Sequence, residues 1–508
     1  MKKTYDIIVI GSGLGGLSSS AELALSGKKV LVLEQHSRVG GCATSFKRKG
    51  HIFEAGLHMT AMVSSKNGNN GFYEKLSLLD KLTFLPAPEF FHFLGNGYEY
   101  TFKNNPEDNI RDLSEMFPKE KKAIKKFFDT IFTIHDQTMK INDKKALGFM
   151  LSLLASPVLY PKVLNSMFIS LGKYLNKNFK DDKLKAILLG NIGYYGDDPY
   201  DVSFLFYAIA QTGYFRYGGA YIQGGSHQLP DAMADIITEN NGEILTQQEV
   251  TEIVMENGKA VGVRYRSKRK DATESEAYAN IIIANSAIPN VRKNLLSQEE
   301  GKVLKKYDKF TIAPSIMTLY VALDKPLSEL GNKYYSLILY NSKKFKLENF
   351  KELNRGDFKD RPAILCDYSQ LDAKLSPEGK GYLVLSLIDH LKDWEDLSEE
   401  DYRLKKKEVA NTLINRIYEL FPKMEAHVEH VELATARTMK RYLMTPNGTA
   451  YGYTNTPKQS LIFRPQAKSG IPNLYFASAW ALPGAGFGGA LTSGNICAAQ
   501  IKKDLGIK

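Results

Sequence analysis

Short uninterrupted apolar runs near the start of the chain predict strands that are buried on both faces. Ile7–Ile10 and Val30–Leu33 each hold four apolar residues, and the helix-length segment Leu17–Leu25 lies between them. Such runs are typical of parallel strands that are covered by helices on both sides. Ala279–Ala284 and Leu474–Ala477 repeat the pattern far along the chain. The apolar pattern therefore predicts an α/β fold with a parallel sheet.

Alternating apolar and polar positions predict antiparallel strands elsewhere. Gln248–Arg266 holds two alternating arms around Asn257-Gly258, the dipeptide preferred in a type I′ turn. Tyr98, Tyr100 and Phe102 alternate in the same way and favour a second hairpin with the apolar segment before them. Strand-like runs after residue 300 predict a second sheet in a substrate domain, at 316–323, 334–339 and 382–388.

Helical periodicity dominates between residues 105 and 215, as in Glu120–Thr138, and an amphipathic helix is predicted at Lys405–Tyr418. Leu147–Leu175 is crowded with large apolar residues, and its prolines limit it to two short helices. One interpretation is the core of a helical cap domain. The other is an apolar surface that enters the lipid interface or lines a lipid-sized tunnel. Because no run of about 20 apolar residues occurs, we expect no segment that spans a bilayer.

A glycine turn joins the first predicted strand to the first predicted helix. Gly11, Gly13 and Gly16 have the spacing G-x-G-x-x-G, which suits a tight turn, a close approach of a pyrophosphate and close helix–strand packing. The helix N-terminus supplies free N–H groups for phosphates. Glu34 follows the second strand, where a carboxylate can accept hydrogen bonds from ribose hydroxyls. These residues predict a Rossmann-like site for FAD or NAD, because an acid at this position disfavours the 2′-phosphate of NADP.

Two further segments favour FAD over NAD. Arg38, Gly40 and Gly41 complete the pattern E-x-x-x-R-x-G-G after the second strand, which resembles the extended fingerprint of flavoproteins with two dinucleotide-binding domains. Near the C-terminus, a glycine-rich turn follows the strand Leu474–Ala477, and a helix is predicted from about Gly489. The N-terminus of that helix can stabilise negative charge on a flavin ring.

Composition and charge limit the remaining classes. The chain has 508 residues, enough for two or more domains, and a net charge of +11. The charge fits either a lysine-rich solvated surface or attraction to an anionic membrane, whereas no nucleic-acid recognition motif accompanies it. Cys42, Cys366 and Cys497 are widely spaced and predict a reducing compartment. The apolar run after Met1 is too short for a signal peptide. We therefore expect a cytoplasmic protein that is peripheral on the inner face of the membrane.

Several motifs in succession resemble the superfamily of phytoene desaturases, carotenoid isomerases and retinol saturases. The matching segments are GSGLGG at 11–16, LEQHSRVGG at 33–41, YIQGGSHQLPDAMADII at 221–237, EVTEI at 249–253, IIIANSAIP at 281–289 and LPGAGFGGALTSG at 482–494. EQH followed by GLH at 56–58 is most similar to retinol saturases. One departure is Ser478-Ala479, where many relatives carry Gly-Asp.

The resemblance implies a discontinuous FAD-binding domain of the GR2 type, formed by residues 1–104, 216–300 and 440–508. An α+β substrate or cap domain would comprise 105–215 and 301–439, with possible membrane-facing helices at 147–175. Val250 would contact the adenine side through its backbone, and the glycines after residue 484 would approach the isoalloxazine. The expected cofactor-binding residues are Gly11, Ser12, Gly13, Leu14, Gly15, Gly16, Glu34, Gln35, Arg38, Gly40, Gly41, Cys42, Val250, Ala479, Gly486, Phe487, Gly488 and Gly489.

The implied activity is flavin redox chemistry at a carbon–carbon double bond of a long polyene or isoprenoid lipid, such as a carotenoid or retinoid. His58 is the candidate catalytic residue, since its motif would place it beside the flavin; no metal site is expected. The EQH…GLH motif favours saturation or isomerisation, and NAD(P)H is a candidate external reductant. The alternatives are a phytoene-type desaturase, a flavin amine oxidase and a non-catalytic protein that binds FAD and lipid. The sequence leaves the oligomeric state open.

Overall fold

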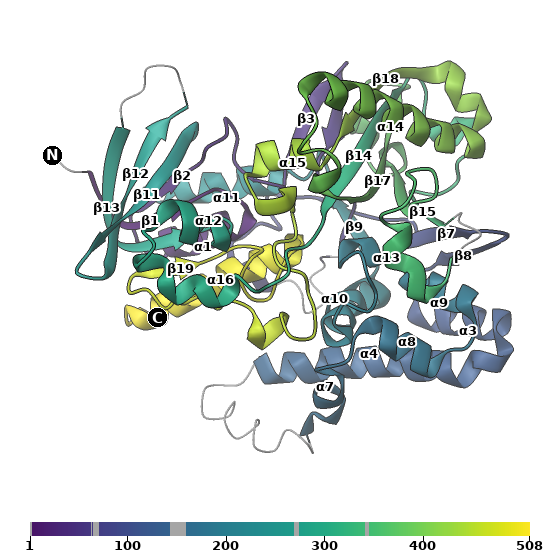
Figure 1. Cartoon of the computed structure of the whole chain (residues 1–508), viewed down its shortest axis with the longest axis horizontal. Coiled ribbons are helices and arrows are strands. Elements are labelled where there is room, and N and C mark those ends of the chain that lie inside the picture. Colours follow the sequence, from purple (N-terminus) through teal and green to yellow (C-terminus); the bar gives the residue numbers. More distant parts are fainter. Residues whose placement is uncertain are drawn as a thin grey trace.

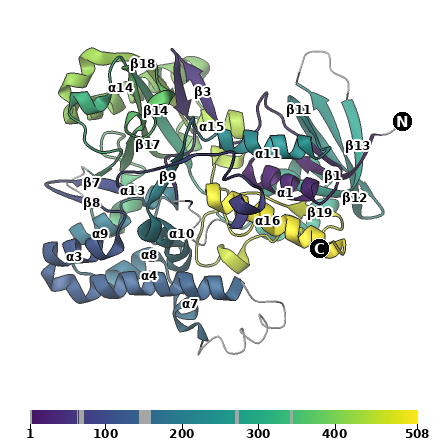
Figure 2. The same ribbon diagram turned by 180° about the vertical axis from the view of Figure 1, so that it is seen from behind.

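The chain forms two large β-sheets and a layer of helices in the computed structural model, which describes residues 3–61, 63, 71–142, 159–268, 274–340 and 345–507. In Figure 1 the first sheet and both chain ends lie on one side of the molecule. The second sheet lies at the top of the other side, and the helical layer lies beneath it. Figure 2 shows the same arrangement from behind.

The first sheet has seven strands and contains the predicted parallel strands. Its order is β10-β2-β1-β13-β12-β11, and β19 also pairs with β13. The bounds are β1 (Lys3–Ile10), β2 (Val30–Leu33), β10 (Glu243–Leu245), β11 (Gln248–Glu256), β12 (Lys259–Ser267), β13 (Glu274–Ala284) and β19 (Leu474–Phe476). Strands β10, β2, β1, β13 and β19 are parallel, whereas β11 and β12 form the antiparallel hairpin. The turn between them has positive φ at Asn257 and Gly258, as a type I′ turn requires.

Three helices pack together on this sheet: α1 (Leu14–Leu25), α11 (Gln228–Glu239) and α16 (Phe487–Asp504). The short α12 (Ile288–Asn290) follows β13. Helices α1 and α16 approach closely at Gly494, where a Cβ atom would lie 2.4 Å from the Gly15 carbonyl oxygen. The N-terminal and C-terminal segments of the chain therefore form one structural unit.

The second sheet also has seven strands, in the order β18-β14-β17-β16-β15-β7-β8. The bounds are β7 (Phe91–Gly95), β8 (Tyr98–Phe102), β14 (Ser315–Leu323), β15 (Ser336–Tyr340), β16 (Ala363–Asp367), β17 (Gly381–Asp389) and β18 (Val428–Ala434). All neighbours are antiparallel except β7 and β15. The hairpin β7–β8 is predicted correctly. It pairs with β15 and so belongs to this sheet, whereas β1 and β2 of segment 1–104 belong to the first sheet. One side of the sheet is covered by α14 (Glu399–Leu420), whose buried apolar residues pack against β14 and β17.

The helical layer lies below the second sheet in both views. Its helices are α3 (Pro106–Met116), α4 (Lys121–Asn142), α7 (Pro161–Ser166), α8 (Leu171–Asn178), α9 (Asp182–Leu189), α10 (Phe204–Tyr217) and α13 (Phe350–Leu353). Of the apolar stretch Leu147–Leu175, residues 147–158 lie outside the described residues. The rest forms α7 and the first part of α8, and buries Val163, Leu171 and Leu175. In the part of the chain described, no helix is long and apolar enough to cross a membrane.

Small elements connect these layers. They are α2 (Gly71–Lys75), α15 (Ala436–Leu443), the hairpin β3 (Ser45–Arg48) and β4 (His51–Glu54), and the small sheet of β5 (Thr60–Ala61), β9 (Gly219–Ile222) and β6 (Phe84–Pro86). The hairpin β3–β4 turns at Lys49-Gly50, both with positive φ. It directs the chain from the glycine motifs toward the second sheet.

Candidate active site

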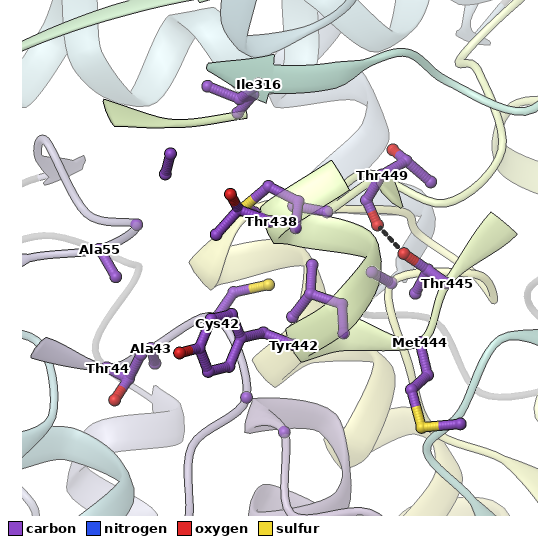
Figure 3. A pocket seen from close by; sticks show the side chains of 18 of the residues that line it. Cys42, Ala43, Thr44, Ala55, Ile316, Thr438, Tyr442, Met444, Thr445 and Thr449 are labelled. Carbon is purple, nitrogen blue, oxygen red and sulfur yellow. Dashed lines mark hydrogen bonds between the residues drawn. The ribbon is translucent and has the colours of Figure 1, made fainter. Parts of the chain in front are cut away.

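A cavity of about 1380 Å³ lies where the carboxyl ends of the parallel strands face the second sheet. Ligand-binding crevices in open α/β sheets occur at this edge. Figure 3 shows part of the lining, which comes from three regions far apart in the sequence. The labelled residues are Cys42, Ala43, Thr44 and Ala55 from the segment after β2, Ile316 on β14, Thr438 and Tyr442 on α15, and Met444, Thr445 and Thr449 after α15.

The glycine turn after β1 lines one end of the cavity. Gly11 has a φ of 92°, and its carbonyl oxygen accepts a hydrogen bond from Asn285 Nδ2 at 3.2 Å. A Cβ on Gly13 would lie 2.7 Å from the same Nδ2 atom. A Cβ on Gly15 would lie 2.4 Å from the Ala477 carbonyl oxygen, and one on Gly16 2.3 Å from the Gly11 carbonyl oxygen. The close packing thus occurs at Gly15 as well as at Gly16.

The N-terminus of α1 opens into the cavity at Leu14 and Gly15. Its N-cap residue is Gly13, which has no side chain to cap the helix, and the first turn contains no acidic residue. The N–H groups and the partial positive charge of this helix end are therefore available to an anion such as a pyrophosphate.

Glu34 lies at the end of β2 with a buried side chain that lines the cavity. Its Oε2 accepts hydrogen bonds from the Ser12 backbone N–H at 2.9 Å and from the Ser12 hydroxyl at 2.5 Å. Its Oε1 accepts one from the His36 backbone N–H at 2.8 Å. The carboxylate is thereby held in one orientation at the cavity wall, as a ribose-binding acid needs to be.

The segment after Glu34 crosses the mouth of the glycine turn. Gly40 and Gly41 have φ values of 115° and 60°, and a Cβ on Gly41 would lie 3.2 Å from the Gly13 Cα atom. Arg38 lines the cavity and donates a hydrogen bond from Nη1 to the Ser45 carbonyl oxygen at 3.4 Å. Burial raises the pKa of the Cys42 thiol to about 11, so it remains protonated at neutral pH.

The C-terminal glycine segment supplies the opposite wall. Helix α16 begins at Phe487, two residues before the start predicted at about Gly489. Its N-cap residue is Gly486, which has no side chain to cap the helix. Ala479, Gly486 and Phe487 line the cavity, whereas Gly488 and Gly489 do not. A Cβ on Gly488 would meet no atom within 4 Å, whereas one on Gly489 would lie 2.6 Å from the Gly484 carbonyl oxygen.

The structure brings most of the predicted site residues together. His58 and fourteen of the expected cofactor-binding residues line the cavity: Gly11, Gly13, Leu14, Gly15, Glu34, Gln35, Arg38, Gly40, Gly41, Cys42, Val250, Ala479, Gly486 and Phe487. The other four do not line it: Ser12, Gly16, Gly488 and Gly489. Ser12 is fully buried and holds Glu34.

At the other end of the cavity, four side chains form one chain of hydrogen bonds. His58 Nδ1 lies 2.7 Å from the Tyr194 hydroxyl, and His58 Nε2 lies 3.2 Å from Ser386 Oγ. Ser386 Oγ lies 3.2 Å from Thr318 Oγ1. Burial lowers the pKa of His58 to about 4 and raises the pKa of Tyr194 well above its usual range. At neutral pH the imidazole is therefore neutral and the phenol keeps its proton.

The wall around this cluster is largely apolar. The strands of the second sheet and α13 contribute Ile316, Tyr340, Phe350, Ile364 and Ile388. Within the described ranges, each of the four carboxylates that line the cavity already has a partner. These pairs are Glu34 with Ser12, Glu249 with Arg266, Glu399 with Arg437 and Glu432 with Arg48.

Sequence reasoning did not identify Asn285, Tyr194, Ser386 or Arg464. Asn285 carried a local signal, because it directly follows the predicted strand Ala279–Ala284. Tyr194 and Ser386 had none, since they reach His58 only through tertiary contacts. Arg464 is buried and donates hydrogen bonds to Asn455 Oδ1 and to the carbonyl oxygens of Tyr453 and Ala479, which fixes the segment that lines the cavity.

The cavity fits an elongated dinucleotide. Two uncapped helix N-termini, a buried carboxylate and glycines that leave no room for a Cβ all face it. Its volume also exceeds the range of about 300–1,000 Å³ that is usual for one small ligand. There is therefore room for a dinucleotide and for a second molecule beside it.

Comparison with known proteins identifies the family. Residues 14–502 match the family described as flavin containing amine oxidoreductase. Chloroplastic prolycopene isomerase of Daucus carota is 28% identical, with 100% of this chain and 81% of that protein covered. All-trans-retinol 13,14-reductase of Danio rerio is 28% identical, with 98% and 86% covered. These matches confirm the resemblance to carotenoid isomerases and retinol saturases.

Solved structures show the same fold at lower identity. An oxidoreductase from Methanosarcina mazei superposes with a TM-score of 0.64 at 18% identity and covers 98% of this chain and 100% of its own. Putrescine oxidase with bound putrescine gives a TM-score of 0.64 at 15% identity, with 98% and 99% covered. Because the family match extends over nearly the whole chain, this protein belongs to the flavin-containing amine oxidoreductases and has their Rossmann-like flavin-binding fold.

Proposed function

We propose that the protein is an FAD-dependent oxidoreductase that acts on carbon–carbon double bonds of a long polyene or isoprenoid lipid, with saturation or isomerisation as the favoured reactions. One observation carries the proposal. A single cavity is lined by the dinucleotide motifs at one end and by apolar side chains of the second sheet at the other.

FAD would occupy the end of the cavity that the glycine motifs line. The α1 N-terminus at Leu14 and Gly15 would bind the pyrophosphate, and Glu34 would accept hydrogen bonds from the ribose. The uncapped α16 N-terminus at Gly486 would face the flavin end. When bound, the flavin supplies hydride chemistry at a carbon–carbon bond. We propose NAD(P)H as the external reductant.

The apolar end suits a neutral, conjugated substrate rather than an amine. A cationic amine loses its hydration in an apolar cavity, and an unpaired carboxylate is one group that could replace it. Among the residues that the structure describes, no carboxylate of the cavity lining is left without a partner. Ile316, Ile364 and Ile388 offer apolar surface instead. The names of the two relatives, prolycopene isomerase and all-trans-retinol 13,14-reductase, support the same class of substrate.

The cluster around His58 would hold a proton at the substrate end. Tyr194 has a protonated hydroxyl next to His58 Nδ1, and Ser386 lies on the opposite side of the imidazole. Saturation of a double bond needs one proton at carbon in addition to the hydride, and Tyr194 Oη can supply it. His58 would orient the Tyr194 hydroxyl, and the cluster could draw a replacement proton through Ser386 and Thr318.

Product analysis tests the proposal directly. The purified protein is loaded with FAD and incubated anaerobically with retinol, with carotenes or with unsaturated fatty acids, with and without NADPH. We expect a polyene product that has gained two mass units, or one of unchanged mass with a new double-bond geometry. A loss of two mass units would identify a desaturase instead.

Two outcomes would overturn the proposal. One is a protein that neither carries a flavin spectrum nor regains it with FAD. The other is a flavin that is bleached anaerobically by an amine and not affected by any polyene, which would identify an amine oxidase.

A further inference from the structure

An exposed apolar patch lies outside the cavity and joins two distant segments of the chain. Phe168 follows α7, and Ile462 and Phe463 lie in a short 3₁₀ helix, Leu461–Phe463. Their exposed fractions are 63%, 65% and 37%. The rings of Phe168 and Phe463 are 6.0 Å apart between centroids. These three residues, the Phe168 patch, are therefore apolar neighbours exposed to solvent.

The backbone on either side holds Ile462 and Phe463 in this exposed position. Leu461 has a φ of 52°, a left-handed conformation that a leucine rarely adopts. Ser460 before it and Arg464 after it are both buried. The segment is anchored at both ends, and Leu461 turns it in an unfavourable conformation. The exposure of Ile462 and Phe463 is therefore fixed by the fold and does not result from a loose chain end.

The sequence segment that carries Phe168 is strongly basic. Residues 119–185 contain fourteen lysines and six acidic residues, which gives this segment a net charge of +8 out of the chain's +11. Lys173 and Lys177 on α8, which begins three residues after Phe168, are exposed, as are Lys121, Lys122, Lys125 and Lys126 near the start of α4. In both views α4, α7 and α8 lie together at the lower edge of the molecule. Apolar residues beside a basic surface match a membrane with anionic headgroups.

We propose that the Phe168 patch inserts into the interface of an anionic lipid bilayer, with the exposed lysines of α4 and α8 facing the headgroups. A second copy of the chain is a poorer partner for this surface, because it would bring two positively charged segments together. The anionic inner leaflet of the cytoplasmic membrane has the required chemistry. Phe168 lies within the stretch 147–175 expected from the sequence, whereas Ile462 and Phe463 come from a distant part of the chain that the sequence did not indicate. The proposal does not depend on the reaction that the cavity supports.

Vesicle flotation tests the proposal with the full-length protein. The vesicles contain phosphatidylcholine alone or phosphatidylcholine with phosphatidylglycerol. The test variant is the double substitution Phe168→Ser and Phe463→Ser, and the matched control is Leu404→Ser. Leu404 is also 63% exposed, but it lies on α14, at the opposite end of the molecule from α7 in Figure 1.

We expect the wild type and Leu404→Ser to float with the anionic vesicles at low salt and to remain at the bottom with phosphatidylcholine alone or at high salt. Loss of two inserted aromatic side chains should weaken binding of the double variant by about tenfold or more. All three proteins should keep the same flavin spectrum and the same turnover of detergent-solubilised substrate. A membrane defect is thereby separated from a failure of the proposed reaction.

Two results would overturn the proposal. One is equal flotation of the double variant and the wild type, or no flotation of either. The other is a wild type that is dimeric in size-exclusion chromatography and a double variant that is monomeric, which would assign the patch to contact between two copies.

Discussion

Replacing Gly15 with alanine tests whether the contact between α1 and the end of β19 fixes the cofactor turn. A Cβ at this position would lie 2.4 Å from the Ala477 carbonyl oxygen and 3.1 Å from the Ser478 backbone nitrogen. Both neighbours are backbone atoms directly after β19, so they cannot rotate away as a side chain could. Helix and strand must therefore separate by about 0.6 Å or more to reach even a close contact of 3.0 Å.

The expected magnitude follows from two opposing effects. Extra atoms forced into a close-packed site typically cost about 1–3 kcal/mol. A glycine-to-alanine change in a helix gains up to about 1 kcal/mol through helix propensity. We expect Gly15→Ala to lower the free energy of unfolding by about 1–2 kcal/mol, because the overlap with backbone outweighs the gain in propensity. It should also reduce the amount of bound flavin, since Gly15 lines the cavity.

Gly488→Ala is the matched control. It lies in the first turn of α16, and a Cβ there would meet no atom within 4 Å. Urea unfolding of the flavin-free proteins, followed by circular dichroism, gives the stabilities, and absorbance after loading with FAD gives the flavin content. Gly488→Ala should match the wild type or exceed its stability by up to about 1 kcal/mol. If Gly15→Ala is as stable as Gly488→Ala and binds as much flavin, the packing argument is wrong.

Three further substitutions test other parts of the site. Glu34→Gln removes the charged acceptor now held by Ser12 and should weaken FAD binding by about tenfold to a hundredfold, measured by fluorescence titration. His58→Gln should reduce the loss of stability on acidification. Burial lowers the His58 pKa from 6.5 to about 4, so the wild type loses up to about 3 kcal/mol of its free energy of unfolding as the pH falls through this range. Arg464→Met leaves buried acceptors such as Asn455 Oδ1 unpaired and should cost about 3 kcal/mol in urea unfolding.

Each of these expectations has a contrary outcome. Unchanged FAD affinity in Glu34→Gln would mean that this carboxylate serves only to hold the glycine turn. A pH–stability profile of His58→Gln that coincides with the wild-type profile would show that the imidazole is not excluded from protonation. Wild-type stability of Arg464→Met would show that water replaces the guanidinium.

The cofactor end of the site could be predicted because its information is local. Gly11, Gly13 and Glu34 lie within one βαβ unit, and the spacing of such a unit is set by the length of one helix and one strand. The same reasoning predicted the helix that follows the second glycine segment to within two residues of its start. It did not show which of these glycines the packing requires. Gly489 is required by a neighbouring carbonyl oxygen, whereas Gly488 faces open space. That difference depends on the Gly484 backbone, which the sequence pattern does not reveal.

The substrate end could not be predicted because it is assembled from long-range contacts. The strand β7 was recognised, but its parallel pairing with β15 joins residues more than 240 positions apart. His58 was singled out from a motif, yet its partners Tyr194 and Ser386 come from the helical layer and from the middle of the second sheet. Serine and tyrosine in such places carry no signal until the fold brings them together.

The protonation states at that end limit the acid–base chemistry that the cluster can add to the proposed reaction. Desaturation removes a proton from carbon, and a general base works best when its pKa is near the working pH. Burial lowers the pKa of His58 to about 4, so its neutral ring is a poor base. The neighbouring Tyr194 has a raised pKa and keeps its hydroxyl proton. By the same criterion Tyr194 is a weak acid, so the cluster keeps its protons in place at neutral pH and does not supply the general base that a desaturation would use.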